Sequence, residues 1–221
     1  MIIAIDGPSG SGKSTLGRML ARALKLLYID TGSMYRAVAL AVIDAEIDPG
    51  DKEAVTALAN EIEIDLRGDP DSLSVLLNGH DVTEKIRTES VTEMSSVVST
   101  IPGVRRAMVE RQRAIGKRGA VLNGRDIGTV VFPDADVKFF LTAAPEERAE
   151  RRYKEDQITA ASSATFAETL ADMIERDRRD SSRADSPLKV ADDAIVIDST
   201  GKSIDEVYEE MMQKIDVYRN H

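Results

Sequence analysis

Short apolar runs recur along the chain and alternate with segments of helical spacing. Apolar residues after the first run fall at positions 16, 19, 20, 23 and 24, and another helix is predicted over 32–43. Strand–helix–strand–helix order of this kind predicts a parallel sheet covered by helices. The five runs predicted to be buried strands of this sheet are 2–5, 26–29, 120–122, 137–141 and 194–197.

The pattern changes from residue 61 onward. Apolar and polar residues alternate in period two on both sides of a turn at 67–71, and Asn78-Gly79 is a two-residue hairpin signal. This segment predicts a small antiparallel sheet inserted into the parallel core. Helical spacing then returns from 88 to 115, with a break near Pro102-Gly103.

The last third of the chain is mostly helical. A stretch from 145 to about 183 has a weaker polar patch at 159–164. A closing helix is predicted over 203–215, where Ser203 and Glu206 form a capping box and the apolar residues make one stripe. That stripe predicts core packing. The two histidines, His80 and His221, are expected to be structural or exposed to solvent.

Composition narrows the class of protein. A chain of 221 residues makes one sizeable domain or a core with an insertion. Cysteine is absent, no apolar stretch is long enough to span a bilayer, and no basic leader precedes the first strand. We therefore expect a cytoplasmic protein without disulfides. The net charge of −10 argues against a nucleic acid polymer or a membrane as partner, so anionic ligands must meet locally gathered Lys and Arg.

The segment GPSGSGKS at 7–14 matches the P-loop pattern in full, between a predicted strand and an amphipathic helix. Its glycines allow backbone N–H groups to point at phosphate oxygens, aided by the helix N-terminus. Lys13 can reach the β- and γ-phosphates and the Ser14 hydroxyl can ligate Mg²⁺. The residues predicted to bind ATP phosphates are Gly7, Pro8, Ser9, Gly10, Ser11, Gly12, Lys13, Ser14 and Thr15.

A P-loop alone does not separate a kinase from a nucleotide switch or a motor. The guanine-reading N-K-x-D pattern is absent and the chain is short for a motor. DTGSMYR at 30–36 and NGRD at 123–126 each follow a predicted core strand, and parallel sheets bind ligands beyond the carboxyl ends of their strands. Arg36 and Arg125 are therefore predicted to bind a second phosphate.

With these motifs in place, the sequence resembles the bacterial cytidylate (CMP) kinases. IAIDGPSGSGKST, DTGSMYRA, NGRDIGTVVFPDADVKFFL, ERDRRDSSRADSPL and DAIVIDST follow that family's order and spacing over nearly the whole chain. The resemblance implies transfer of the γ-phosphoryl group of ATP to CMP or dCMP with Mg²⁺, on a P-loop α/β fold. It also implies one domain with three parts: a core (1–35, 105–150 and 180–221), a CMP-binding insert (about 36–104) and a short helical lid (about 151–175).

The resemblance also implies individual roles. Arg36 and Arg125 would bind the CMP phosphate, and Arg148 and Arg152 would be lid arginines that act with Lys13 in catalysis. Arg176 and Asp180 would hold the ribose hydroxyls. The residues that would gather around cytosine or its sugar are Thr31, Ser96, Arg105, Asp126 and Arg183.

Two departures from the family pattern leave the metal site open. The family often has an acidic residue at the position of Asn123, so its part in holding the metal is undecided. Relatives can read GKGT where this chain reads GKST, so either Ser14 or Thr15 could meet the metal.

The charge run at 173–188 is typical of a solvated helix face, but the resemblance favours a ligand-binding role for part of it. On a helix ending before Pro187, Arg176, Asp180 and Arg183 are i, i+4 and i+7. We expect this charged stripe to border a packing face formed by Phe166, Leu170, Met173 and Ile174. The simple surface role is expected for Asp177, Arg178 and Ser182.

The predicted chemistry is in-line transfer to a phosphate oxyanion, without a covalent intermediate. The alternatives are a kinase for another acceptor, such as AMP, UMP or shikimate, and a nucleotide-binding switch. A monomer is expected.

Overall fold

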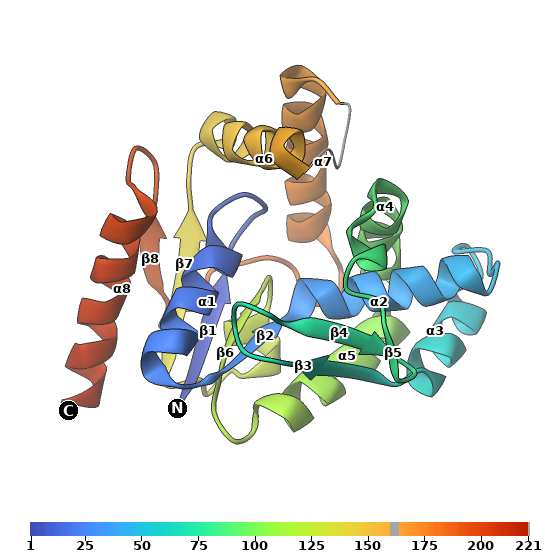
Figure 1. The fold of residues 1–221 in the computed structure, drawn as a ribbon, viewed down its shortest axis with the longest axis horizontal. Helices are drawn as coiled ribbons and strands as arrows, with labels where there is room; N and C mark the ends of the chain where they lie inside the picture. Colours follow the sequence, from blue (N-terminus) through green and yellow to red (C-terminus); the bar gives the residue numbers. More distant parts are fainter. Residues whose placement is uncertain (160–163, 221) are drawn as a thin grey trace. The chain divides into compact units, whose positions relative to one another are not determined.

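The computed structural model describes residues 1–159 and 164–220 (Figure 1). A five-stranded sheet has the order β2-β6-β1-β7-β8, and the pairs β1–β6, β1–β7 and β7–β8 run parallel. The predicted parallel sheet is therefore confirmed, and each strand overlaps its predicted run. Its strands are β1 (Ile2–Asp6), β2 (Leu27–Asp30), β6 (Ala120–Gly124), β7 (Val137–Thr142) and β8 (Ile195–Asp198).

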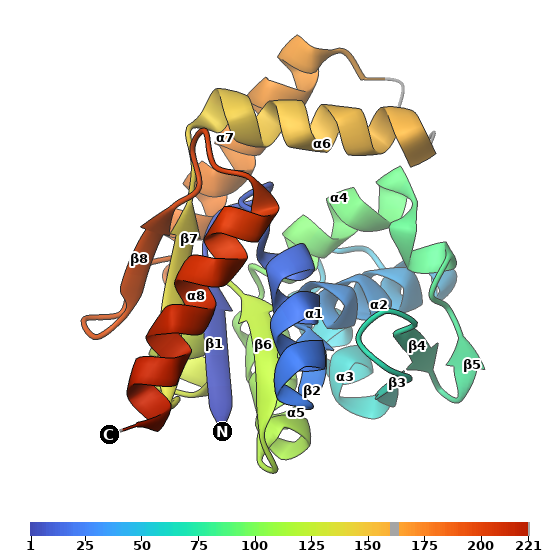
Figure 2. The same cartoon turned by 60° about the vertical axis from the view of Figure 1, so that its left-hand side comes forward.

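Helices α1 (Lys13–Leu24) and α8 (Ile204–Arg219) pack against each other and cover one face of this sheet (Figure 2). The stripe of α8 buries Val207, Met211 and Ile215, and the Ser203–Glu206 capping box is present. Core packing by this stripe, as predicted, is confirmed.

Helices α6 (Pro145–Thr159) and α7 (Phe166–Ser182) pack against each other beyond the carboxyl end of β7 (Figure 1). Thr165 opens α7 with a capping box completed by Glu168. The polar patch predicted at 159–164 lies largely outside the described residues, as does His221. A π-helical turn at Ile127–Val131, which the sequence pattern did not indicate, follows β6.

The segment from residue 30 to 115 forms a second group of elements. The antiparallel sheet β3-β4-β5 confirms the predicted insert, and Asn78 and Gly79 both have positive φ, as a tight hairpin requires. The helical break expected near Pro102 is present, and Pro102 is the first residue of the last helix in this segment. The elements are α2 (Thr31–Asp44), α3 (Lys52–Glu61), β3 (Ile64–Arg67), β4 (Ser74–Leu77), β5 (His80–Asp81), a 3₁₀ turn (Lys85–Arg87), α4 (Glu89–Val98) and α5 (Pro102–Gly116).

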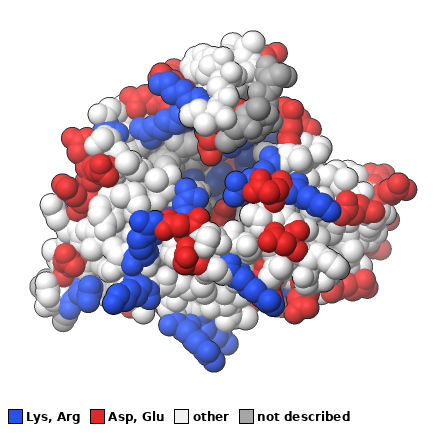
Figure 3. All heavy atoms as spheres, viewed as in Figure 1, with Lys and Arg blue, Asp and Glu red and all other residues white. Residues whose placement is uncertain are grey.

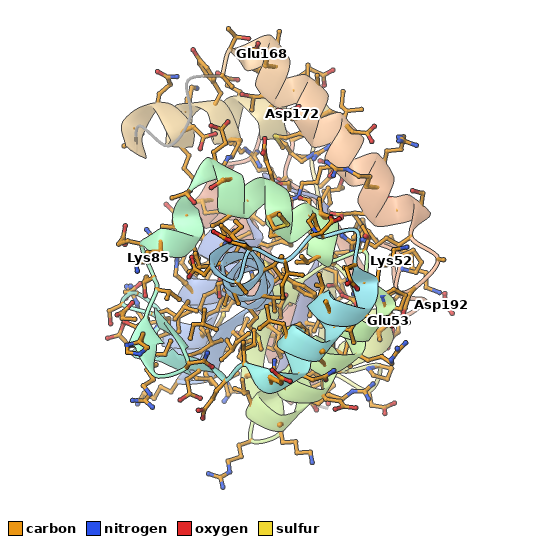
Figure 4. All side chains as sticks on the ribbon, turned by 90° about the vertical axis from the view of Figure 1, so that its right-hand side faces the viewer. Lys52, Glu53, Lys85, Glu168, Asp172 and Asp192 are labelled. Carbon is orange, nitrogen blue, oxygen red and sulfur yellow. The ribbon has the colours of Figure 1, made fainter. Side chains whose placement is uncertain are left out.

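Helix α3 was not predicted. It begins at Lys52 and Glu53 (Figure 4), and the Asp51 carboxylate caps it by accepting from the Ala54 N–H at 3.0 Å. At its other end, the Arg111 guanidinium donates to the carbonyls of Ala59, Asn60 and Ile62 at 2.6–3.0 Å. Arg111 therefore caps a helix C-terminus.

By internal contacts the chain forms two compact units, Met1–Ile29 with Gly116–His221, and Asp30–Ile115. The division into core, CMP-binding insert and lid stays a prediction. Across the described residues, no helix is both long and apolar enough to cross a membrane.

Candidate functional site

The P-loop joins β1 to α1 in a conformation that needs its glycines. Gly7, Gly10 and Gly12 have φ of 146°, 73° and 92°. A Cβ on Gly7 would lie 2.0 Å from the carbonyl oxygen of Leu141, so a side chain there is excluded by space as well as by φ. The conformation of the loop thus requires glycine at these positions, and their role in presenting N–H groups to phosphate stays a prediction.

Lys13 is buried at the first turn of α1, with 6% of the residue exposed. Its Nζ donates to the Pro8 carbonyl at 2.5 Å and to the Ser11 hydroxyl at 3.3 Å. Burial, and then the nearby positive charge of Arg125, hold the pKa of Lys13 well below its ordinary 10.5. An anionic phosphate would reverse that effect, so this ammonium group is suited to bind one.

The metal candidates lie beside Lys13. Ser14 and Thr15 are exposed at the start of α1, and Asn123 Nδ2 donates to the Ser14 hydroxyl at 3.0 Å. Asn123 thus contacts the predicted metal ligand directly. The part of the chain that the structure describes holds no group of three His, Cys, Asp or Glu side chains able to bind a metal ion alone.

Asp6, at the end of β1, is a site residue that sequence reasoning did not single out. Its two carboxylate oxygens accept from the N–H groups of Ile127 and Gly128, both at 2.8 Å. Burial raises the pKa of Asp6 from 3.8 to about 6, although the two hydrogen bonds lower the pKa in part. Asp6 therefore fixes the turn that follows Arg125 and Asp126. A carboxylate at the end of an apolar strand was the available signal.

A cluster of guanidinium groups surrounds one buried carboxylate. Asp180, 3% exposed, accepts from Arg125 Nε at 2.7 Å and from Arg183. Burial alone would raise the pKa of Asp180, but Arg125, Arg183 and Arg176 outweigh it and hold the pKa below 3.8. Four of the predicted substrate-binding residues therefore lie together, and Arg125, Arg176 and Asp180 also act electrostatically on Lys13.

The packing face predicted for α7 is wrong in part. Phe166 and Ile174 are 39% and 51% exposed, whereas Met173 and Asp180 are buried. A carboxylate can occupy the buried side of α7 because cations from other elements neutralise its charge. Glu168 and Asp172 lie on the exposed surface of the first turns (Figure 4).

Arg183 lies outside the helix on which it was predicted. Helix α7 ends at Ser182, and Arg183 is its C-cap in a non-helical conformation. Its side chain nevertheless reaches back to Asp180, because the next residues turn and the Leu188 N–H bonds the Asp180 carbonyl at 2.8 Å.

Asp177, which was expected to be an exposed surface residue without partners, also forms an ion pair. It pairs with Arg148 Nη1 at 2.7 Å, and Arg148 is itself buried. The other predicted lid arginine, Arg152, binds carboxylates on its own helix, Asp156 at 2.8 Å and Glu155 at 3.7 Å.

The remaining predicted residues belong to the second unit. Arg36 pairs with Asp30 at 3.3 Å, beside a buried Thr31 at the start of α2. Arg105 is 2% exposed, and its guanidinium carbon lies 5.6 Å from the centre of the Tyr35 ring. Ser96 on α4 is half-buried and donates to the Thr92 carbonyl at 3.4 Å.

A P-loop after the central strand of a parallel sheet, with a buried lysine beside clustered guanidinium groups, defines the class of P-loop α/β nucleotide-binding proteins. A solved structure of an uncharacterized protein from Eubacterium ventriosum shares this fold, with a TM-score of 0.55 and 12% identity over 98% of each chain.

The family model described as Cytidylate kinase matches residues 3–217. The cytidylate kinase of Citrifermentans bemidjiense is 50% identical over 96% of this chain and 91% of its own. That of Corynebacterium efficiens is 50% identical over 96% and 93%. The chain belongs to the cytidylate kinase family and is an enzyme of the nucleoside monophosphate kinase class.

Proposed function

We propose that this enzyme transfers the γ-phosphoryl group of ATP to CMP or dCMP, giving ADP and CDP or dCDP. One observation carries the proposal. Lys13 of the P-loop lies in the same electrostatic cluster as Arg125, Arg176 and Asp180, so a donor-phosphate site adjoins a second group of cations. Relatives named cytidylate kinases, 50% identical over nearly the whole chain, support CMP as the acceptor.

The donor would bind at the P-loop. Backbone N–H groups and the N-terminus of α1 would hold the phosphates, and Lys13 would leave the Pro8 carbonyl for the β- and γ-phosphates. The residues proposed to bind ATP are those from Gly7 to Thr15.

The acceptor would bind through two sets of side chains. Arg36 and Arg125 would hold its phosphate, and Arg176 and Asp180 its ribose hydroxyls. Asp180 suits that task because its depressed pKa keeps it an ionised hydrogen-bond acceptor at neutral pH. The residues proposed around the base and sugar are Thr31, Ser96, Arg105, Asp126 and Arg183.

The residues at the P-loop fit Mg²⁺. Magnesium keeps several waters and binds nucleotide phosphates with one or two protein ligands, so a single hydroxyl suffices. The exposed Ser14 hydroxyl would be that ligand, with Asn123 orienting it from 3.0 Å. Bound Mg²⁺ would supply charge neutralisation on the phosphate oxygens.

Catalysis would rest on positioning and electrostatics. The acceptor is already an oxyanion, so no general base is needed. Lys13, Arg36 and Arg125 would stabilise charge on the transferring group. A helical lid at about 151–175, with Arg148 and Arg152 at or beside its start, would exclude water, which otherwise attacks ATP.

The test is an assay of ADP formation with ATP, Mg²⁺ and each of CMP, dCMP, UMP and AMP. We expect CMP and dCMP to give the highest kcat/KM. A clear preference for AMP or UMP would contradict the proposal that CMP is the acceptor. Slow ATP hydrolysis that CMP does not affect would instead indicate a nucleotide switch. A cytoplasmic location and a monomeric state stay predictions from the sequence.

A further inference from the structure

The Arg148 guanidinium connects three segments of the first unit. Its Nε donates to the Ala143 carbonyl at 3.0 Å, just before α6. Its Nη1 donates to the Ser9 carbonyl of the P-loop at 2.9 Å and pairs with the Asp177 carboxylate of α7 at 2.7 Å. One side chain thereby joins the P-loop, α6 and α7.

Because the Arg148 side chain is buried, its contacts restrict the movement of their partners. The Arg148 side chain is only 5% exposed, and a buried guanidinium that loses a partner is strongly unfavourable. The positions of the Ser9 carbonyl and of Asp177 are therefore tied to each other. The second carboxylate oxygen of Asp177 is buried without a hydrogen-bond partner among the described residues, which is not the arrangement that stability alone favours.

Backbone packing strengthens the same connection. A Cβ on Gly10 would lie 2.7 Å from the Arg148 carbonyl oxygen and 2.9 Å from Met173 Cε. The P-loop at Gly10 thus rests directly on the α6 backbone and on a buried side chain of α7. A displacement of this part of the loop towards α6 must therefore displace the α6 backbone.

Helix α7 also links Asp177 to the guanidinium groups that surround Asp180. Asp177 directly follows Arg176, and Asp180 is one turn further on, bonded to Arg125 at 2.7 Å. Because a helix turn moves as a rigid piece, the position of Asp177 sets the positions of both neighbours.

We propose that Arg148 is a positioning residue through which nucleotide in the P-loop sets the placement of Arg176 and Asp180. The proposal rests on the proposed function, since it takes the P-loop as the donor site and the cluster as the acceptor site. In this proposal Arg148 couples the two sites and does not contact the transferring phosphate. Donor occupancy then increases the affinity for CMP.

The experiment measures CMP affinity by titration calorimetry, with and without saturating Mg²⁺ and the non-hydrolysable analogue adenylyl imidodiphosphate. For the unaltered enzyme we expect the analogue to lower the CMP Kd by about five-fold or more, the low end of measured couplings. In Asp177→Asn and Arg148→Lys the ratio of the two Kd values falls to within about two-fold of one. Asp177→Asn keeps the shape of the side chain, and Arg148→Lys keeps the charge but cannot reach three acceptors at once.

Arg178→Gln is the matched control, because it removes the exposed Arg178–Glu175 pair from the same helix without touching the P-loop. The control should keep the full ratio. A thermal melt establishes that each variant is folded. Equal loss in the control, an unchanged ratio in both test variants, or no coupling in the unaltered enzyme would overturn the proposal.

Failure of the proposed function gives a different result. If the folded, unaltered enzyme did not bind CMP, or did not bind the ATP analogue, the assignment of the sites would fail, and with it the coupling. Binding of both ligands with a ratio of one would overturn the positioning role alone.

Discussion

Three ionisable side chains at the site depart from ordinary behaviour, each for its own reason. Burial raises the pKa of Asp6 to about 6, and it lowers the pKa of Lys13, where Arg125 adds repulsion. Asp180 is also buried, but three arginines keep its pKa low. Neighbouring charge, more than depth of burial, therefore decides whether the pKa of a buried carboxylate is raised or lowered.

Asp6 gives a pH-dependent prediction. Between pH 3.8 and about 6 the folded protein binds more protons at Asp6 than the unfolded chain does, so the stability due to Asp6 falls as pH rises through this range. The shift corresponds to about 3 kcal/mol. We therefore expect the free energy of unfolding of the unaltered protein, minus that of Asp6→Asn, to fall by about 2 kcal/mol between pH 4 and about 6.5, which is most of the full shift.

Urea unfolding of both proteins across this range measures the difference, and a carboxyl carbon titration by NMR locates the Asp6 midpoint. A midpoint near 4 with a constant difference would contradict the assignment. Asp172→Asn, on the exposed surface of α7, serves as the control for the removal of a carboxylate.

Arg176, proposed to bind the acceptor, gives a prediction that distinguishes the proposed acceptor site from the proposed donor site. Arg176→Ala should raise the KM for CMP, or lower kcat, by about 10- to 100-fold, the range expected when a charge-assisted hydrogen bond is lost. ATP affinity should change far less. Steady-state kinetics with each substrate varied measure this, with Arg178→Ala as the exposed control; a change confined to ATP would show that the role is wrong.

At the scale of elements, α7 departs most from the expected pattern. A simple amphipathic helix buries its apolar stripe, yet α7 exposes Phe166 and Ile174 and buries Asp180. The partners of Asp180 and Asp177 come from other segments, Arg125 after β6 and Arg148 in α6. Helix α7 is therefore fixed by ion pairs as well as by apolar contacts.

The P-loop gives a prediction at this scale. Gly10→Ala introduces a Cβ at φ 73° and 2.7 Å from a backbone oxygen, whereas Gly79→Ala does so at φ 78° with nothing within 4 Å. Both changes incur about 1–2 kcal/mol of left-handed strain. Gly10→Ala should lose about 1–3 kcal/mol more and weaken ATP binding. Thermal and urea unfolding, with calorimetry for ATP, compare the pair, and equal destabilisation would contradict the packing argument.

At the scale of the whole molecule, charge sets which anions can bind. The net charge is −10, and on the face drawn in Figure 3 basic and acidic side chains are interspersed. The cations at the proposed site, such as Lys13 and Arg125, are largely buried and suit a small anion. A polyanion needs an extended basic surface.

A labelled DNA duplex tests this property. We expect its fluorescence anisotropy to stay constant as the protein is added at low salt, because long-range repulsion opposes the approach of a polyanion. A labelled CMP analogue in the same buffer is the control and should bind. Duplex binding that weakens steeply with added salt would contradict the prediction.

Much of the fold could be predicted because its signals are local. Three patterns each predict the conformation of the residues that form them: the β-branched runs, the Asn78-Gly79 turn and the Ser203–Glu206 box. Helix α3 was missed although Val55, Ala59 and Ile62 are buried along one side and Asp51 caps it. Arg111, which completes the C-terminal end of α3, lies about fifty residues away along the chain.

The sequence by itself determined the P-loop, the order of the parallel sheet's strands along the chain and the family, because glycine conformation and strand pattern depend on adjacent residues. Only the tertiary structure decided which charges are buried and with what partners. Asp6, Asp177 and Arg148 act through groups that are distant along the chain. Electrostatic partnership depends on distance in space, which a linear pattern does not contain.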